Sequence, residues 1–535
     1  MERSEYDYVI VGAGSAGCVL AARLSADPDV TVALVEAGGP DDDPAVRVPF
    51  AAVELFGSES DWAFTTAPQP RLDGRAVDWP RGRTLGGSSA INFQMWVPGH
   101  DADYDDWAAA AGEGWSAPVV RAAMRRAERW AGEPGEGATY GTAGPLWISP
   151  PRDPDATTAD FLRACAELGL PPVRGGLAGP GGTGCALTPL NQYGGERWSA
   201  ADGYLRPAMD RPNLDVRTRT AVRRVVLEDG PGGPRASAVE TADGERVAAR
   251  REVVLSAGAV ASPQLLLLSG IGDPSGLREA GVGVRSALPG VGRNLQDHVI
   301  LDLPVRATAP TGLAGAAGDA ARELYESSRR GPLTSNIAEA VAFLRSDGGP
   351  GAPDLELIWT PVAFTEEGIG EEPGVTAGVV LLRPESTGRV TLAGPDPSAP
   401  PVIDPGYLTA AADLPRLVAG VRFVERLLDT AALRPLVAGP FGQWKPGLSD
   451  ADLGAYAGGG LQTLFHPVGT CRMGRAASAG ADGSVVDERL RVHGVRGLRV
   501  ADASVIPRVP RGHTHAHAVA VGERAAELIT EDARG

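Results

Sequence analysis

The histidines of this chain are few and unevenly placed, which makes them the first candidates for chemistry. Of seven histidines, three fall in one short run, His513, His515 and His517. An imidazole ring titrates near neutral pH, so a histidine pair can accept a substrate proton and orient the atom that loses it. If the run were an extended strand, alternate histidines would face one side and could share a metal ion. No Asp, Glu or Cys stands beside the run to complete such a site, and no metal site is predicted.

The start of the chain predicts an element that could position chemistry on a bound cofactor. An apolar run at residues 6–11 indicates a buried strand, and the small residues of 18–24 indicate the start of a helix. A second apolar run at residues 31–35 ends at Glu36. The order strand, glycine-rich turn, helix and strand is that of a βαβ unit.

The turn inside this unit has the spacing GxGxxG, formed by Gly12, Gly14 and Gly17. In such a turn the first glycine permits the tight bend, the second lets the backbone approach a pyrophosphate, and the third lets the helix pack against the strand. Glu36 stands where an acid can accept hydrogen bonds from an adenosine ribose. The motif predicts a dinucleotide site but does not by itself choose between NAD and FAD.

Three further segments have distinctive motifs. They are GRTLGGSSAIN at residues 82–92, GAVASPQLLLLSGIG at 258–272, and a C-terminal stretch that runs from HPVGTCRMG at 466–474 to LRVADASVIP at 498–507. These segments resemble the glucose–methanol–choline (GMC) oxidoreductase family, whose cofactor is FAD. Connecting pieces also fit, at 197–205, 288–298 and 383–407. The resemblance covers nearly the whole chain.

The resemblance implies an α/β fold, α+β overall, with two domains. A Rossmann-like FAD-binding domain would gather residues 1–150, 195–300 and 460–535. A substrate-binding domain, from 150–195 and 300–460, would form a roof on a mostly antiparallel sheet, with six strands implied by the family. Within this roof, 347–353 and 394–401 are predicted turns.

The residues expected to contact the FAD lie in the glycine turn, in the small-residue loop after position 82 and at the ends of predicted strands, one of which is the apolar stretch at 498–500. They are Gly12, Gly14, Ser15, Ala16, Gly17, Glu36, Ala37, Arg83, Gly87, Ser88, Asn92, Val222, Ala257, Asp502, Ala503 and His515. For Asp502, a capping role is the alternative. Some relatives attach FAD covalently through a histidine at the position that Ile91 occupies here, so we expect non-covalent FAD.

The resemblance also assigns catalytic positions. His466 precedes the Pro-Val-Gly-Thr motif, and His513 is the ninth residue before Gly522, where relatives carry His or Asn. His515 stands where Asn or Gln is usual, and His517 stands where Pro is common. A shift of two positions would make His515 the catalytic residue instead. A short polar loop is expected before a final helix at 518–529.

The implied reaction is oxidation of a substrate alcohol to a carbonyl, in which a histidine takes the hydroxyl proton and a hydride passes to flavin N5. The electron acceptor would be O2 or another carrier, and the identity of the alcohol stays open. Two alternatives also stay open: a lyase of the same fold that causes no net redox change, and another specialised flavin chemistry. His100, His298 and His493 are expected to be structural or at the surface.

Composition narrows the partners. The chain has 535 residues and a net charge of −17, and no basic patch suggests a nucleic-acid partner. No apolar run is long enough for a membrane span. The four scattered cysteines argue against a disulfide framework. The first residues lack an export pattern, so a cytoplasmic location is expected.

Overall fold

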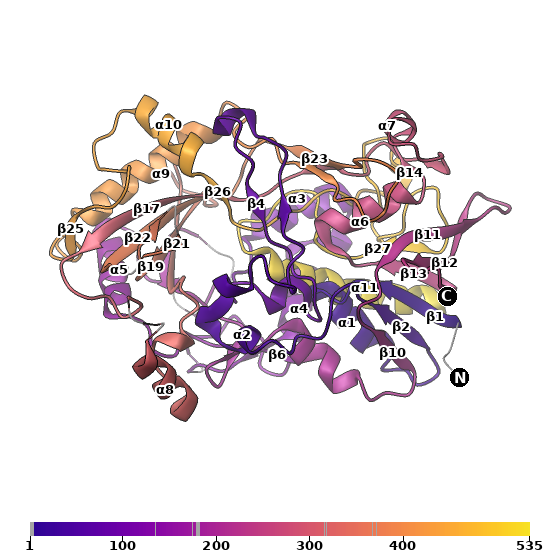
Figure 1. The fold of residues 1–535 in the computed structure, drawn as a ribbon, viewed down its shortest axis with the longest axis horizontal. Helices are drawn as coiled ribbons and strands as arrows, with labels where there is room; N and C mark the ends of the chain where they lie inside the picture. The colour runs from indigo at the N-terminus through magenta and orange to yellow at the C-terminus, as the bar shows by residue number, and fades with distance from the viewer. Residues whose placement is uncertain are drawn as a thin grey trace.

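The computed structural model describes residues 5–133, 135–173, 175–177, 182–314, 316, 318–365, 368–370 and 372–534. The first four residues, on which the expectation about export partly rests, lie outside this part of the chain. Figure 1 shows two units side by side along the long axis of the molecule, one around β1, β2 and β13 and the other around β17, β22 and β19. The prediction of an α/β fold, with one sheet of mainly parallel strands and a second, antiparallel sheet, is confirmed.

The first unit is built on a sheet whose central strands are parallel. In order, these strands are β10 (Leu214–Arg217), β2 (Val32–Val35), β1 (Glu5–Val11), β13 (Arg246–Leu255) and β27 (Leu498–Val500). The early half of β13 also pairs antiparallel with β12 (Arg235–Thr241), which pairs in turn with β11 (Val222–Glu228). The strands predicted at 6–11, 31–35 and 498–500 are confirmed within one residue.

Two helices, α1 (Ser15–Leu24) and α11 (Thr514–Arg534), pack against each other beside this sheet (Figure 1). Small residues make the contact possible. A Cβ on Gly17 would lie 1.9 Å from the carbonyl oxygen of Gly12, and a Cβ on Gly522 would lie 3.0 Å from Ala16. The close approach that glycine allows therefore fixes α1 on the strand behind it and α11 on α1.

The start of α11 differs from the prediction. The helix begins at Thr514, so His515 and His517 lie in its first turn and not in a polar loop or an extended strand. Both rings are buried, and burial against neighbouring elements has outweighed the modest helix propensity of histidine. The strand arrangement that would let alternate histidines share a metal is therefore not formed. No cluster of three or more His, Cys, Asp or Glu that could hold a metal occurs in the described ranges.

The second unit is an antiparallel sheet. Its strands, in order, are β25 (Val437–Pro440), β17 (Val299–Ala307), β22 (Gly374–Leu381), β19 (Leu355–Thr360), β18 (Ala340–Leu344) and β7 (Gly184–Leu187). β26 (Gln462–Thr463) also pairs with β17, which makes seven strands where six were expected. The predicted turns are confirmed: 347–353 joins β18 to β19, and 394–401 joins β23 (Gly388–Thr391) to β24 (Val402–Asp404).

The helices α5 (Ala156–Glu167) and α9 (Asp413–Leu428) pack on one face of this second sheet. Alternate residues of β19, among them Leu357 and Trp359, belong to the core under these helices. Because successive side chains of a strand point to opposite faces, Glu356 and Ile358 lie on the face turned away from the helices. One acidic residue is thereby placed in a fully buried strand whose other residues, apart from Thr360 at its end, are apolar.

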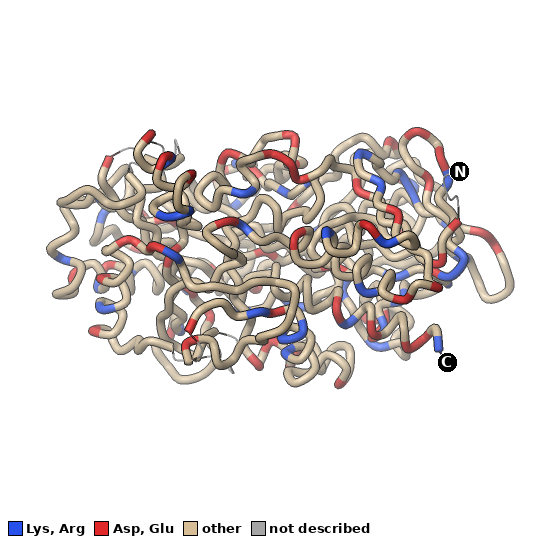
Figure 2. The backbone as a smooth tube through the Cα atoms, turned by 90° about the horizontal axis from the view of Figure 1, so that it is seen from below, with Lys and Arg blue, Asp and Glu red and all other residues tan. Residues whose placement is uncertain are grey.

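The remaining helices connect and cover the two sheets. They are α2 (Pro44–Arg47), α3 (Asp101–Ala111), α4 (Ala117–Ala127), α6 (Gly258–Leu268), α7 (Pro274–Glu279), α8 (Asp319–Ser328) and α10 (Asp450–Gly460). Figure 2 shows basic and acidic residues interspersed over the described chain, without a continuous basic track. In the same residues, no helix combines the length and the apolar character that a membrane span requires.

Candidate active site

A cavity of about 810 Å³ opens at the carboxyl ends of the parallel strands. Gly12 follows β1, Glu36 follows β2, Ser256 follows β13 and Asp502 closely follows β27, and all four line the cavity. Open parallel sheets bind ligands at this edge, because the loops that leave the strands there diverge and leave a crevice. The volume is in the range of a cofactor site.

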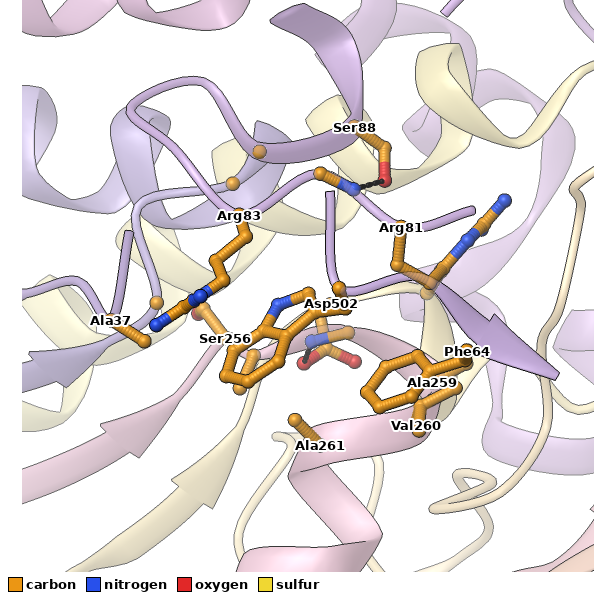
Figure 3. Close-up of a pocket in the computed structure, with 18 of the residues that line it drawn as sticks. Ala37, Phe64, Arg81, Arg83, Ser88, Ser256, Ala259, Val260, Ala261 and Asp502 are labelled. Carbon is orange, nitrogen blue, oxygen red and sulfur yellow. Dashed lines mark hydrogen bonds between the residues drawn. The ribbon is translucent and has the colours of Figure 1, made fainter. Parts of the chain in front are cut away.

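The structure brings together almost all residues that the sequence assigned to cofactor and catalysis. The cavity is lined by Gly12, Gly14, Ser15, Ala16, Glu36, Ala37, Arg83, Gly87, Ser88, Asn92, Val222, Ala257, Asp502, Ala503, His515, His466 and His513. Gly17 lies outside the lining and serves the packing of α1 on β1. Figure 3 shows Arg83 reaching from the loop after position 82 toward Ala37.

Several glycines give this cavity a wall of bare backbone. Gly87 has a φ of +53°, and a Cβ there would fall 2.7 Å from the Cα of Gly14. Gly12 has a φ of +98°, and a Cβ there would fall 2.6 Å from the carbonyl oxygen of Ser256. The hydroxyl of Ser88 accepts a hydrogen bond from the Gly82 N–H at 3.1 Å, which closes the loop (Figure 3). This cradle fits a flat ring or a phosphate that approaches the backbone closely.

Two buried carboxyl groups mark the strand ends. Glu36 accepts hydrogen bonds from the N–H groups of Ala13 (2.7 Å) and Gly38 (2.8 Å), and burial raises its pKa. Asp502 accepts hydrogen bonds from the Gly258 N–H (2.9 Å) and the Ser504 N–H (2.8 Å), and burial raises its pKa as well. Asp502 therefore does have the capping role that was the alternative, and it lines the cavity at the same time.

The protonation pattern of His466 follows from a chain of hydrogen bonds. The carbonyl oxygen of Leu382 lies 3.1 Å from Nε2 of His298 and can only accept, so this nitrogen of His298 carries the proton. Neutral His298 then accepts at Nδ1, which lies 3.0 Å from Nδ1 of His466. His466 must donate there, and its Nε2 is left unprotonated.

His466 stays neutral under ordinary conditions. Burial, with further contributions from His513, His298 and Arg81, holds its pKa well below the usual range. Burial likewise lowers the pKa of His298 to about 3. A neutral imidazole whose Nε2 is held unprotonated is a proton acceptor for a group bound in the cavity.

His513 is held differently, by a carboxyl group from the second sheet. Its Nε2 lies 3.1 Å and 3.2 Å from the two oxygens of Glu356, whose side chain is fully buried on β19. Because carboxylate oxygens accept, Nε2 of His513 carries a proton. Its other nitrogen, Nδ1, is free of hydrogen bonds to the described residues. The rings of His466 and His513 lie 4.6 Å apart between centroids. Two imidazoles can therefore address one small substrate group.

His515 faces the cavity beside α1. Its Nδ1 lies 2.9 Å from the hydroxyl of Ser15, while its Nε2 is buried without a hydrogen-bond partner within the described ranges. Burial lowers its pKa to about 3. A buried polar nitrogen left unpaired in a cavity wall is a site for a ligand atom. His517, by contrast, bonds the carbonyl oxygen of His513 at 2.9 Å outside the lining.

Sequence reasoning missed His298, Glu356 and the lining by 396–401. The sequence predicts a structural or surface position for His298, and the structure places it buried and in direct contact with His466. The signal for Glu356 was a single acid in a strongly apolar strand. For 396–401 the sequence predicted only a turn, which Gln264 of α6 holds at the cavity through the Ala399 carbonyl at 3.2 Å.

Comparison with known proteins shows which family this chain resembles. The family model for GMC oxidoreductases matches residues 6–300 and 384–522. An uncharacterised GMC-type oxidoreductase of Mycobacterium bovis is 45% identical over 98% of this chain and 99% of its own length. The alcohol dehydrogenase (acceptor) of Pseudomonas putida is 37% identical over 98% of this chain and 95% of its own length.

A solved structure agrees with these relatives. A variant of formate oxidase from Aspergillus oryzae, solved to show the effect of a mutation on FAD modification, superposes with a TM-score of 0.91 at 31% identity, covering 100% of this chain and 99% of that chain. This neighbour and the family match support FAD as the cofactor. The chain belongs to the GMC oxidoreductase family.

Proposed function

We propose that this protein oxidises an alcohol to a carbonyl compound with FAD as the oxidant. The observation that carries the proposal is the hydrogen-bond chain from Leu382 through His298, which leaves an unprotonated Nε2 on His466 in the cavity wall. Loss of a hydroxyl proton is the acid–base part of alcohol oxidation, and a fixed neutral imidazole suits it.

The FAD would be held without a covalent bond. The glycine cradle, Glu36 and the unpaired Nε2 of His515 offer backbone and side-chain partners for it. Ile91 also lines the cavity, and its side chain has no atom that could attach a flavin. When bound, FAD supplies an acceptor for the hydride that leaves the substrate carbon.

In this proposal the two catalytic histidines divide the work on the substrate oxygen. His466 accepts the hydroxyl proton at Nε2 while its Nδ1–H stays on His298. His513, fixed by Glu356, orients the same oxygen through its free nitrogen. The helix α11 begins at Thr514 in the cavity wall, and the positive end of the helix dipole stabilises negative charge there. The electron acceptor that reoxidises the enzyme would be O2 or another carrier.

Anaerobic mixing of the FAD-loaded protein with a panel of alcohols tests the proposal. We expect one class of alcohol to bleach the flavin band and to yield the matching carbonyl compound. A His466→Ala variant should bind FAD but lose at least about 100-fold in reduction rate, as expected for removal of a general base. His493→Ala is the matched control, because His493 bonds Ser484 outside the cavity. Cleavage of a substrate while the flavin stays oxidised would instead establish a lyase.

A further inference from the structure

Three phenylalanine rings from distant segments meet beside His466. Phe56 follows the short helix at 49–55, Phe93 follows the small-residue loop, and Phe465 directly precedes His466. The ring centroid of Phe56 lies 5.9 Å from that of Phe93 and 5.4 Å from that of Phe465, and the ring centroids of Phe93 and Phe465 are 6.4 Å apart. All three rings line the cavity and remain partly exposed, so together they form what we call the phenylalanine face.

Phe465 occupies a strained backbone conformation. Its φ is +65°, in the left-handed region that a bulky aromatic residue rarely adopts. The surroundings hold it there: its N–H donates to the Thr463 hydroxyl at 2.7 Å, and its carbonyl oxygen accepts from Nη2 of Arg81 at 2.8 Å. Such strain persists at functional sites, where it fixes a geometry.

The same turn fixes the catalytic ring. The N–H of His466 donates to Oδ1 of Asp297 at 2.7 Å, and Asp297 is itself buried and also accepts from the Thr463 hydroxyl at 2.6 Å. The ring of Phe465 and the ring of His466 are therefore positioned by one network. A group that stacks on the phenylalanine face would be held at a set distance from Nε2 of His466.

The charges around the face disfavour a cationic substrate. The carboxyl groups of the cavity wall lie on the side of the parallel sheet and α6: Glu36 follows β2, Asp502 follows β27, and Asp396 lies in the turn that is held to α6. The carboxyl group of Glu356 is already engaged by His513. Two charged groups bond the turn of the phenylalanine face. The guanidinium of Arg81 lines the cavity, whereas the carboxyl group of Asp297 lies outside the lining and already accepts from the His466 N–H and the Thr463 hydroxyl.

We propose that the substrate is a primary alcohol on an uncharged aromatic ring, with the ring on the phenylalanine face and the hydroxyl group at His466. This inference rests on the proposed alcohol oxidation and names the substrate class for it. Aromatic pairs add to plain apolar burial through their quadrupoles, so the face distinguishes an aromatic ring from a saturated ring of the same size. In the proposed reaction the hydroxyl proton goes to His466, the carbon that bears the hydroxyl group gives a hydride to FAD, and the alcohol becomes an aldehyde.

The test compares two alcohols of nearly equal size, benzyl alcohol and cyclohexylmethanol, with choline as the cationic probe. Anaerobic stopped-flow mixing with the FAD-loaded protein gives the flavin reduction rate divided by the substrate Kd for each. We expect this ratio to be at least about tenfold higher for benzyl alcohol than for cyclohexylmethanol, and choline to be the poorest. Equal ratios for the two rings, or preference for choline, would overturn the inference while alcohol oxidation stands.

Substitutions of single phenylalanines test whether the phenylalanine face causes the preference for benzyl alcohol. Phe93→Leu and Phe56→Leu should each reduce the preference for benzyl alcohol at least about threefold, with little change for cyclohexylmethanol. Phe441→Leu is the matched control, because Phe441 packs on Arg306 away from the cavity. FAD content and Tm show whether each variant is folded. Because two positions are substituted separately, the test still works if one of the two variants does not fold. An undiminished preference in both folded variants would overturn the inference, whereas a flavin that no alcohol reduces would overturn the proposed function with it.

Discussion

Glu356 offers a sharp test of how the two sheets cooperate, because it is a residue of the roof that fixes a ring of the cavity. Its two carboxyl oxygens lie 3.1 Å and 3.2 Å from Nε2 of His513, and its side chain is fully buried. A Glu356→Gln substitution keeps the size and one accepting oxygen. It removes the negative charge and replaces the second oxygen by an N–H₂ group.

The size of the effect follows from the kind of hydrogen bond that changes. A bond to a charged group contributes about 1.5–3 kcal/mol and a neutral one about 0.5–1.5 kcal/mol, so the substitution costs about 1–1.5 kcal/mol in holding His513. If His513 acts on the oxygen that loses its proton, this cost appears in the barrier as an approximately 5–15-fold slower reduction. The substrate Kd should change less, because the apolar contacts of the substrate stay.

Single-turnover flavin reduction under anaerobic conditions measures the rate and the substrate Kd separately. Glu339→Gln is the matched control: Glu339 is another buried glutamate of the same unit, bonded to Ser335 and Thr158 and outside the cavity lining. An E356Q protein that reduces its flavin at the wild-type rate would refute the role of the Glu356–His513 pair.

Three further predictions concern the cradle, the proton and the core. Gly87→Ala should leave most of the protein without flavin, measured as the flavin-to-protein absorbance ratio, because its Cβ would press on the opposite glycine loop; normal occupancy would contradict the close fit. His298→Ala should slow flavin reduction at least about fivefold, since about 1 kcal/mol of hydrogen bonding no longer keeps the proton of His466 on Nδ1; stopped-flow rates check this, and an unchanged rate would exclude the proton assignment. Burial lowers the pKa of His517 to about 3, below the value of about 6.5 in the unfolded chain, so the stability that neutral His517 contributes is present above pH 6.5 and is lost as the pH falls toward 3. The free energy of unfolding should thus fall less between pH 7 and pH 5 in His517→Gln than in the wild type; parallel pH profiles would argue against it.

The sequence was sufficient to predict those elements that depend on a local pattern of a few residues. The apolar run at 6–11, the glycine spacing after it and the apolar stretch at 498–500 specify strands and a turn over a few residues, and the fold keeps them. The start of α11 was predicted wrongly. Histidines are polar, and the sequence does not show that the rings of His515 and His517 are buried in a helix.

The contacts that complete the site join segments far apart in the chain. Nothing in the spacing shows that His298 lies against His466 or that Glu356 reaches His513, because these pairs depend on how the second sheet sits over the first. The same holds for the phenylalanine face, whose rings come from three segments. A lone acid in an apolar strand is a hint of such a contact, but it does not name the partner.

In the proposed reaction, His466 takes a proton from a hydroxyl group while the attached carbon gives up a hydride. The most direct measurement is anaerobic flavin reduction by benzyl alcohol and by the same alcohol with deuterium on its reacting carbon. We expect the flavin band to bleach with formation of one aldehyde per flavin, deuterium to slow the step severalfold, and His466→Ala nearly to abolish it. A flavin that stays oxidised with every alcohol tried, or that bleaches equally fast in His466→Ala, would contradict the proposed reaction.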